Sequence, residues 1–237
     1  DPTKTEEWHG LLDAMQLSRV DYVIASHAEQ DHAGSIPFAL ERFPDAKLVC
    51  TPKAKGLLMD LLHVDAGRFQ VVEDGETLSL GDLTLEFIHA PWVHWPETML
   101  TYLREQKVLF PCDLFGSHLA TSDLFVSDPS RVYRAAKRYY AEIMMPFKTN
   151  IAKHLERLSG YEINIIAPSH GPLHDNPKFI MDMYRDWVSG PLANKVVIPY
   201  VSMHGSTQVI VDRLIASLAE QDVQVVPYKL SAGDTGR

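Results

Sequence analysis

Apolar runs alternate with helix-like segments over the first third of the chain. Val20 to Ala25, Lys47 to Thr51 and Phe69 to Val72 are short apolar runs of the kind found in buried strands. Between them, the pattern predicts one helix from near Ile36 through Arg42 and another over Pro52 to His63. Strands separated by helical segments in this way predict a parallel sheet covered by helices.

Beyond residue 72 the pattern changes to short strands joined by tight turns, such as Gly81-Asp82 and Glu105-Gln106. Short strands joined by tight turns predict an antiparallel sheet. The expected strands are Thr77 to Leu80, Leu83 to Ile88, Met99 to Leu103 and Val108 to Phe110.

The remainder predicts three helices, a buried strand and the start of a second module. The helices are expected over Arg131 to Met145, Ile151 to Leu158 and Lys178 to Val188, and the strand over Ile163 to Ala167. After Ser189-Gly190-Pro191, strands at Lys195 to Val201 and Val223 to Tyr228 with a helix between them predict a further β-α-β unit. We therefore place a domain boundary near Gly190 to Asn194, with one domain over residues 1–190 and another over residues 195–237.

The densest group of potential metal ligands directly follows the first strand, where His27, Glu29, Asp31 and His32 lie within six residues. Residues two apart on an extended segment point the same way, so His27 and Glu29 can serve one ion while Asp31 and His32, past the bend, serve a second. Exposed loops also gather such residues, but a strand followed by ligands and a helix is typical of sites at the carboxyl ends of strands. Because carboxylate oxygen suits iron or manganese better than zinc, we interpret the group as a di-iron centre.

A dinuclear site needs about six to eight protein ligands, so others must come from elsewhere in the chain. His94 lies in a loop rich in tryptophan and proline, Asp113 follows the strand ending at Phe110, and His170 follows the strand ending at Ala167. Taken singly, these could be a packed loop histidine, a helix cap or turn former, and a surface turn residue. Their joint placement at strand ends favours metal ligands, and a carboxylate at Asp113 could bridge both ions.

Other residues near these segments have weaker signals. His89 and His118 lie close in sequence to His94 and Asp113, which makes them candidates for hydrogen bonding to ligands or substrate. Trp92 is expected to shape the pocket wall together with Trp95. The remaining histidines, His9, His63, His154 and His174, show no signal beyond surface positions or helix ends. The two cysteines, Cys50 and Cys112, lack the spacing of a zinc knuckle or redox pair, and we expect both to be buried small hydrophobic residues.

Composition excludes several classes of function. With 237 residues and 46% apolar residues, the chain can bury the core of one large domain or one and a half. A formal net charge of -9 argues against binding to nucleic acid or an anionic membrane. No apolar stretch approaches the roughly 18 residues of a transmembrane helix, and no signal-like segment opens the chain. We expect a cytoplasmic protein.

The order of these segments resembles the flavodiiron proteins, a branch of the metallo-β-lactamase fold. Four family motifs occur in order and cover most of residues 20–190, whereas hydrolytic zinc relatives generally carry histidine where Glu29 stands. The resemblance implies an α/β protein with a metallo-β-lactamase-like αββα sandwich, N-terminally truncated because the opening strands expected before Asp1 are missing. The motifs stand here as His27-x-Glu29-x-Asp31-His32, His94-Trp95-Pro96-Glu97, Asp113-Leu114-Phe115-Gly116 and Ser169-His170-Gly171-Pro172.

The resemblance also implies how the ligands divide. One iron would take His27, Glu29 and His94. The other would take Asp31, His32 and His170, and Asp113 would bridge the two. Such a site can change the oxidation state of its iron, whereas an all-zinc version could only polarise water.

The second module begins with a strand, a hydroxyl-rich loop and a helix. Hydroxyls and backbone N–H groups at a helix N-terminus can form a phosphate cradle, although a plain β-α turn gives the same pattern. The loop resembles the phosphate loop of flavodoxins, which implies FMN binding with Ser202, Ser206 and Thr207 as phosphate contacts. Only about forty residues of the module are present, so we expect weak or absent FMN binding by this chain and take it for a fragment of a longer protein. The loop runs Ser202, Met203, His204, Gly205, Ser206 and Thr207.

The function that the resemblance implies is an oxidoreductase in which FMN passes electrons to a di-iron pair that reduces nitric oxide to nitrous oxide or dioxygen to water. It also implies a head-to-tail homodimer and a rubredoxin-like or flavin-reductase electron donor. Two alternatives remain open at this point: a zinc-dependent hydrolase of the same fold, acting on thioesters, lactones or phosphoesters, and a non-catalytic remnant or binding module. The sequence does not rank nitric oxide against dioxygen.

Overall fold

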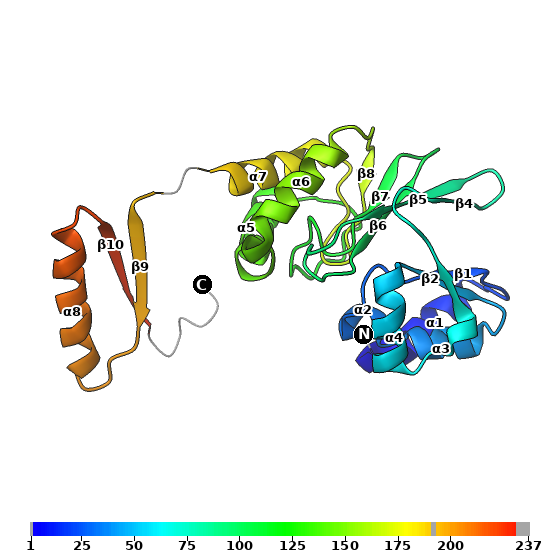
Figure 1. Ribbon diagram of the computed structural model, residues 1–237, viewed down its shortest axis with the longest axis horizontal. Helices are drawn as coiled ribbons and strands as arrows, with labels where there is room; N and C mark the ends of the chain where they lie inside the picture. The colour runs from blue at the N-terminus through cyan, green and yellow to red at the C-terminus, as the bar shows by residue number, and fades with distance from the viewer. Residues whose placement is uncertain (1, 191–192, 231–237) are drawn as a thin grey trace. The chain divides into compact units, whose positions relative to one another are not determined.

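The computed structural model describes residues 2–190 and 193–230. The chain divides into two compact units, Asp1–Ser189 and Gly190–Arg237, and each is described by itself (Figure 1). Within the described ranges, no helix has both the length and the apolar character needed to cross a lipid bilayer.

The first half of unit 1 contains a three-stranded parallel sheet in the order β1-β2-β3, as the alternating pattern predicts. Helix α4 begins where Thr51 caps it, since the Thr51 hydroxyl accepts a hydrogen bond from the Ala54 N–H and Pro52 follows at the first helical position. Helix α1 was not predicted, and none of its residues is buried, which explains its weak apolar periodicity. The elements are η1 (Pro2–Lys4), α1 (Thr5–Ala14), β1 (Tyr22–Ile24), α2 (Gln30–Ala33), α3 (Ile36–Arg42), β2 (Lys47–Cys50), α4 (Pro52–Leu62), η2 (Ala66–Arg68) and β3 (Phe69–Val71).

The second half of unit 1 contains a five-stranded sheet in the order β4-β5-β6-β7-β8. Strands β4 to β7 are antiparallel as predicted, and β8 joins β7 in parallel. The helix predicted to run through Met145 changes at Tyr140 into a π-helical turn. The elements are β4 (Thr77–Ser79), β5 (Thr84–His89), β6 (Met99–Leu103), β7 (Val108–Phe110), α5 (Pro129–Tyr139), η3 (Tyr140–Met144), η4 (Met145–Phe147), α6 (Lys148–Leu158), β8 (Ile165–Ile166) and α7 (Pro177–Ser189).

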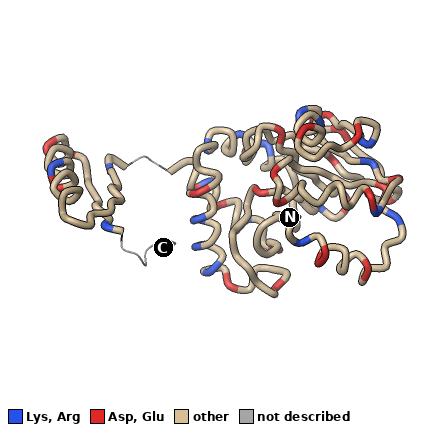
Figure 2. The backbone as a smooth tube through the Cα atoms, turned by 90° about the horizontal axis from the view of Figure 1, so that it is seen from below, with Lys and Arg blue, Asp and Glu red and all other residues tan. Residues whose placement is uncertain are grey.

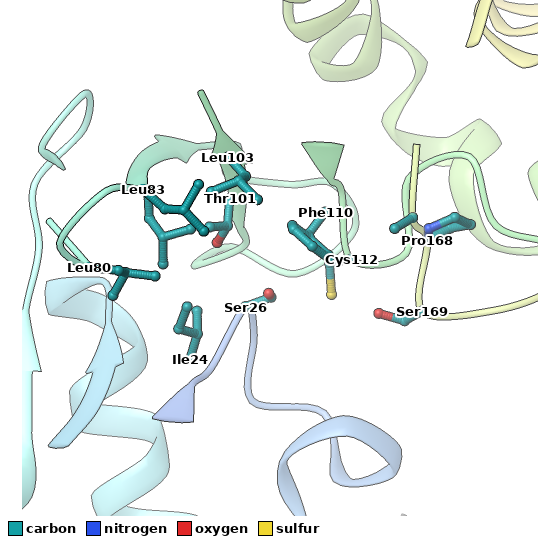
Figure 3. A pocket seen from close by; sticks show the side chains of 12 residues that line it. Ile24, Ser26, Leu80, Leu83, Thr101, Leu103, Phe110, Cys112, Pro168 and Ser169 are labelled. Carbon is teal, nitrogen blue, oxygen red and sulfur yellow. The ribbon is translucent and has the colours of Figure 1, made fainter. Parts of the chain in front are cut away.

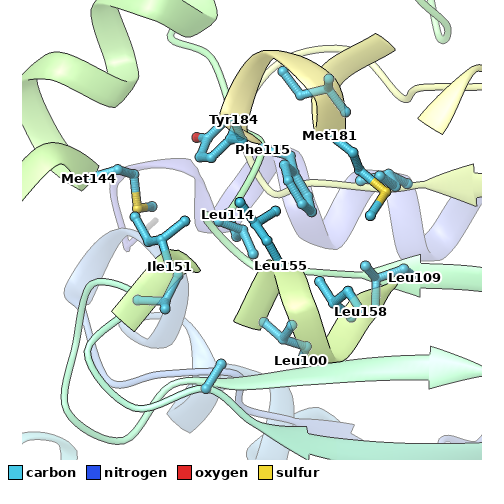
Figure 4. Packing of buried hydrophobic residues seen from close by; sticks show 14 of the residues in the cluster. Leu100, Leu109, Leu114, Phe115, Met144, Ile151, Leu155, Leu158, Met181 and Tyr184 are labelled. Atoms are coloured by element: carbon cyan, nitrogen blue, oxygen red, sulfur yellow. The ribbon is translucent and has the colours of Figure 1, made fainter. Parts of the chain in front are cut away.

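Unit 1 has three apolar layers because its strands are buried on both faces. In β2, Leu48 points into a cluster shared with helices α3 and α4, while its neighbour Val49 points into a cluster between the two sheets. In β5, Phe87 joins the cluster between the sheets, while Ile88 joins a third cluster with helices α5, α6 and α7. Figure 4 shows residues of this third cluster, among them Leu155 and Tyr184. The order helix, sheet, sheet, helix is the expected αββα sandwich.

Unit 2 consists of β9 (Lys195–Tyr200), α8 (Ser206–Ala219) and β10 (Gln224–Lys229). The two strands pair in parallel, with Lys195 opposite Gln224. The unit is therefore one β-α-β element over the described residues.

Charged residues of both signs are interspersed along most of the chain (Figure 2). Helix α5 differs, because four exposed basic residues follow one another along it. One of them, Arg138, forms an ion pair with Glu142 at 2.7 Å. The four are Arg131, Arg134, Lys137 and Arg138.

Candidate metal centre

The structure brings the seven predicted ligands together at the ends of strands from both sheets. His27 follows β1, Glu29 immediately precedes α2, and Asp31 and His32 lie on that short helix. The other three come from the β5–β6 loop and from the segments after β7 and β8. These are His94, Asp113 and His170 respectively.

Four of these side chains form a first cluster. The His94 Nε2 atom lies 3.1 Å from Glu29 Oε2 and 2.9 Å from Asp113 Oδ2. The His27 Nε2 atom lies 3.3 Å from the same glutamate oxygen and 3.4 Å from the same aspartate oxygen. Two imidazole nitrogens and two carboxylate oxygens thus surround one point.

The second cluster lies on the other side of Asp113. His32 Nε2 is 3.2 Å from Asp31 Oδ2 and 3.1 Å from His170 Nε2. The second oxygen of Asp113, Oδ1, is 3.0 Å from His32 Nε2 and 3.4 Å from His170 Nε2. Each oxygen of the Asp113 carboxylate therefore faces a different cluster.

These spacings fit two metal ions. Ligand atoms about 2.0–2.1 Å from one ion lie about 2.9–3.4 Å from one another, which is the range of the distances given for both clusters. Hydrogen bonding alone explains the second cluster poorly, because the Nε2 atoms of His32 and His170 approach each other as well as the same carboxylate oxygen. The mixture of imidazoles and three carboxylates suits iron or manganese.

The electrostatics of the metal-free site centre on Asp113. Burial opposes its charge, but hydrogen bonds from His170, His27, His32 and His94 hold the pKa of its carboxyl far below the ordinary value. Burial likewise opposes protonation of His27, yet its bonds to Asp113 and Cys112 raise the His27 pKa to about 11. The same partners outweigh burial at His32 and raise its pKa to about 9. The charge of Asp113 thus favours the protonated forms of His27 and His32.

Backbone geometry holds the ligands in place. The residue after His170, Gly171, has φ +87°, and a Cβ atom there would collide with Ser117 Oγ. The Ser117 N–H donates to the His170 carbonyl at 3.0 Å. Only glycine fits this turn, which fixes the direction in which His170 leaves β8.

The sequence analysis missed two residues at the site. Glu97 is buried, and its Oε1 atom accepts a hydrogen bond from the Ala28 N–H at 3.0 Å, which ties the β5–β6 loop to the first ligand loop. Cys112 is buried and free, as is Cys50, but its sulfur lies 3.2 Å from His27 Nδ1. The sequence position of each residue could have indicated its place at the site. Glu97 stands in the His94-Trp95-Pro96-Glu97 motif, and Cys112 directly precedes Asp113.

The other histidines considered in the sequence differ in where the structure places them. The His118 ring lies 5.4 Å from the ring of His170, one of the predicted ligands, whereas His89 Nε2 bonds to the carbonyl of Val72, directly after β3. The prediction of a surface or helix-end position for His174 is wrong, because its side chain is buried. No signal in the sequence distinguished it from exposed histidines.

The two tryptophans border the first cluster. The Trp95 ring lies 5.9 Å from the His27 ring. The Trp92 ring stacks at 6.3 Å on Phe147, which itself lies 6.4 Å from the His94 ring. An aromatic wall therefore lies beside His94.

A cavity of about 610 Å³ lies between the two sheets and extends to Cys112, the residue before Asp113. Its lining is mostly apolar, with Leu83 and Leu103 on one side. The sulfur of Cys112 faces it between Ser26 and Ser169 (Figure 3). Cys112 thus stands between this cavity and His27.

The loop predicted to hold phosphate lies between β9 and α8. Gly205 has φ +85° directly before the helix. The Ser202 hydroxyl accepts a hydrogen bond from the Gln208 N–H at 3.2 Å, so it already caps the first turn. The other loop residues are Met203, His204, Ser206 and Thr207.

Comparisons with known proteins agree with the fold. A family model described as "ODP family beta lactamase" matches residues 2–171. Among curated proteins, the nitric oxide reductase of Moorella thermoacetica is 37% identical in an alignment 240 residues long that covers 99% of this chain and 60% of the relative.

Two solved structures are similar over most of the chain. The flavodiiron protein from Giardia intestinalis gives a TM-score of 0.84 at 32% identity, covering 99% of this chain and 59% of that one. The rubredoxin oxygen:oxidoreductase from Desulfovibrio gigas gives a TM-score of 0.78 at 31% identity, and the match covers 89% of this chain and 54% of that one. The chain thus spans little more than half the length of these relatives. The resemblance to flavodiiron proteins and the metallo-β-lactamase-like fold are confirmed.

Proposed function

The chain belongs to the ODP family of beta lactamases, whose model matches residues 2–171, and on that premise we propose that it is the di-iron part of a flavodiiron oxidoreductase. The reaction would be the reduction of nitric oxide to nitrous oxide, of dioxygen to water, or both. The observation that carries this proposal is Asp113, whose two oxygens face separate clusters of imidazole and carboxylate groups. The names of the relatives as nitric oxide reductase and oxygen oxidoreductase support it.

In this proposal, His27, Glu29 and His94 would hold one iron, and Asp31, His32 and His170 would hold the other. Asp113 would be a ligand shared by both. Two irons in such a site would supply electrons to a bound diatomic molecule. The hard carboxylate oxygens are the reason to prefer iron to zinc at these positions.

The protein's own side chains determine where a substrate can enter. His27 and Asp113 form the buried back of the site, with side chains only 1% and 3% exposed. Glu29 and Asp31 are 38% and 43% exposed and form its open side. A small molecule would approach along the Glu29 and Asp31 side, next to the aromatic wall beside His94.

The electron supply is a further part of the proposal. FMN would bind in the complete protein at the loop before α8, with its phosphate at Ser202, Ser206 and Thr207. The name of the Desulfovibrio gigas relative supports a rubredoxin-like donor, and a flavin reductase is the alternative. A head-to-tail homodimer completes the proposed assembly.

The test is an anaerobic metal count followed by stopped-flow mixing of the chemically reduced, iron-loaded chain with each gas. We expect two irons per chain and their rapid oxidation by nitric oxide, dioxygen or both. His94→Ala should lower the count, whereas His63→Asn, a variant at an exposed histidine outside both clusters, should not. Two zinc ions with ester hydrolysis and no iron would overturn the proposal in favour of a hydrolase, and a site that binds iron but reacts with neither gas would favour a binding module.

A further inference from the structure

We propose that the Cys112 sulfur is the hydrogen-bond acceptor that fixes the ring orientation and tautomer of His27. The inference rests on the proposed metal centre and adds to it a positioning residue. Cys112 would act through His27, without touching substrate.

The contact is direct and lies between two buried residues. Cys112 Sγ lies 3.2 Å from His27 Nδ1, and both residues are buried. The opposite ring nitrogen, Nε2, faces Glu29 and Asp113 in the first cluster. Both nitrogens of the His27 ring therefore have a defined neighbour.

Metal binding decides the direction of this hydrogen bond. A neutral imidazole carries one N–H, and the nitrogen that binds a metal cannot carry it. With Nε2 on an ion, the proton is on Nδ1, so Nδ1–H donates and the sulfur accepts. Histidines that bind metals usually donate their other N–H to a partner of this kind, which orients the ring and increases its basicity.

The backbone at Cys112 supports the assignment independently. The residue has φ +56°, a left-handed conformation that a residue with a Cβ atom rarely adopts. The Ser169 N–H donates to the Cys112 carbonyl at 2.8 Å and holds the peptide there. This conformation at the end of β7 places the thiol behind His27 and, one residue later, the Asp113 carboxylate in front of it.

Cys50 provides a matched comparison. It is equally buried but packs in the apolar cluster of α3, α4 and β2, and burial raises the pKa of its thiol to about 12. Its sulfur belongs to none of the groups of potential metal ligands found among the described residues. A comparison of variants at the two cysteines thus separates the effect of burial from the effect of contact with His27.

The first experiment measures zinc affinity by competition with a chromogenic chelator. We expect Cys112→Ala to weaken the tighter zinc site roughly 10–100-fold, the usual effect of losing such a partner. Cys112→Ser keeps a hydroxyl acceptor and should recover part of that affinity. Cys50→Ala should match the wild type.

The second experiment identifies the tautomer in the wild type, so it does not depend on a variant that folds. In the zinc-loaded, ¹⁵N-labelled chain, long-range ¹H–¹⁵N spectra should show a protonated Nδ1 at His27, with a slowly exchanging proton. In Cys112→Ala that proton should exchange faster. A merely structural role for Cys112 would change stability without changing this signal.

The outcomes separate the two proposals. A wild-type chain that binds no metal overturns the metal centre and this inference together. A wild type that binds two ions, with unchanged affinity or unchanged exchange of the His27 proton in Cys112→Ala, overturns only the role of Cys112. A His27 proton on Nε2 in the zinc-loaded chain overturns both the role of Cys112 and the assignment of His27 as a ligand through Nε2. Weaker zinc binding in Cys112→Ala, partial recovery in Cys112→Ser and an Nδ1 proton at His27 support it.

Discussion

At the residue scale, Asp113 lies between the two clusters, and each of its carboxylate oxygens contacts one of them. Asparagine has nearly the same shape but offers one carbonyl oxygen and no negative charge, so it cannot face both clusters with an anionic oxygen. We therefore expect Asp113→Asn to bind at most one of two iron equivalents, measured by elemental analysis after anaerobic loading. Asp82→Asn, a change at an exposed turn residue, is the control. Two tightly held irons in Asp113→Asn would contradict the bridging role.

Asp113→Asn should also change how the metal-free site binds protons. Its bonds to His27 and His32 are the main reason that their pKa values are raised to about 11 and about 9. Removing the charge should lower both pKa values, which NMR titration of the metal-free chain can follow. Unchanged histidine titration would show that other groups hold these protons.

His174 is expected to make stability depend on pH. Its ring is buried, and this burial lowers its pKa from 6.5 to about 4, against weaker opposing effects of the Phe115 carbonyl and Asp175. The unfolded chain therefore binds a proton more readily between these values, so folding stability falls as pH falls from about 6.5 to about 4. The full loss for a shift of this size is about 3 kcal/mol.

The measurement is urea unfolding of the metal-free chain at pH 7 and pH 5. The free energy of unfolding should fall more in the wild type than in His174→Phe, because phenylalanine has no proton to bind. The pH dependence of one chain is subtracted from that of the other. This subtraction cancels the titration of the other histidines, which both chains share. Equal pH dependence in the two chains would show that His174 titrates normally.

At the scale of elements, the sequence predicted most strands and helices because their apolar periodicity follows from burial. Leu48 and Val49 face different layers, so the strand appears as a continuous apolar run, as expected for a strand buried on both faces. Helix α1 buries no residue, so periodicity could not reveal it. The predicted ligands stand in dense motifs, whereas the contact between Cys112 and His27 joins residues far apart in the sequence and could be found only in three dimensions.

The turn after β8 gives the element-scale prediction. Gly171→Ala places a Cβ at φ +87° against Ser117, so the turn must shift and move His170 with it. We expect weaker binding of the second metal ion with the first site largely retained, as seen in a two-step zinc titration. Gly56→Ala is the matched control, since open space surrounds that helical glycine and alanine favours the helix. Equal weakening of both sites would contradict the division into two clusters.

At the scale of the whole molecule, the seven proposed ligands come from both sheets of unit 1, and none of the seven belongs to unit 2. His27 follows β1 of the parallel sheet, while Asp113 follows β7 and His170 follows β8 of the other sheet. A bound ion therefore cross-links the two halves of the sandwich. Since metal binds the folded state, it should stabilise unit 1 by about 4 kcal/mol when its free concentration is about 1,000 times the dissociation constant.

Hydrogen exchange can locate that stabilisation. Loading with zinc should slow amide exchange in β1, β2, β7 and α2, and a chelator should reverse the change, because opening these elements then requires loss of the ion. Exchange in β9 and β10 should stay the same. These strands belong to unit 2, which begins after Ser189 and supplies none of the seven proposed ligands. Slower exchange in both units would show that metal binding is coupled across this boundary. No change in unit 1 would mean that the seven side chains do not hold an ion between the sheets.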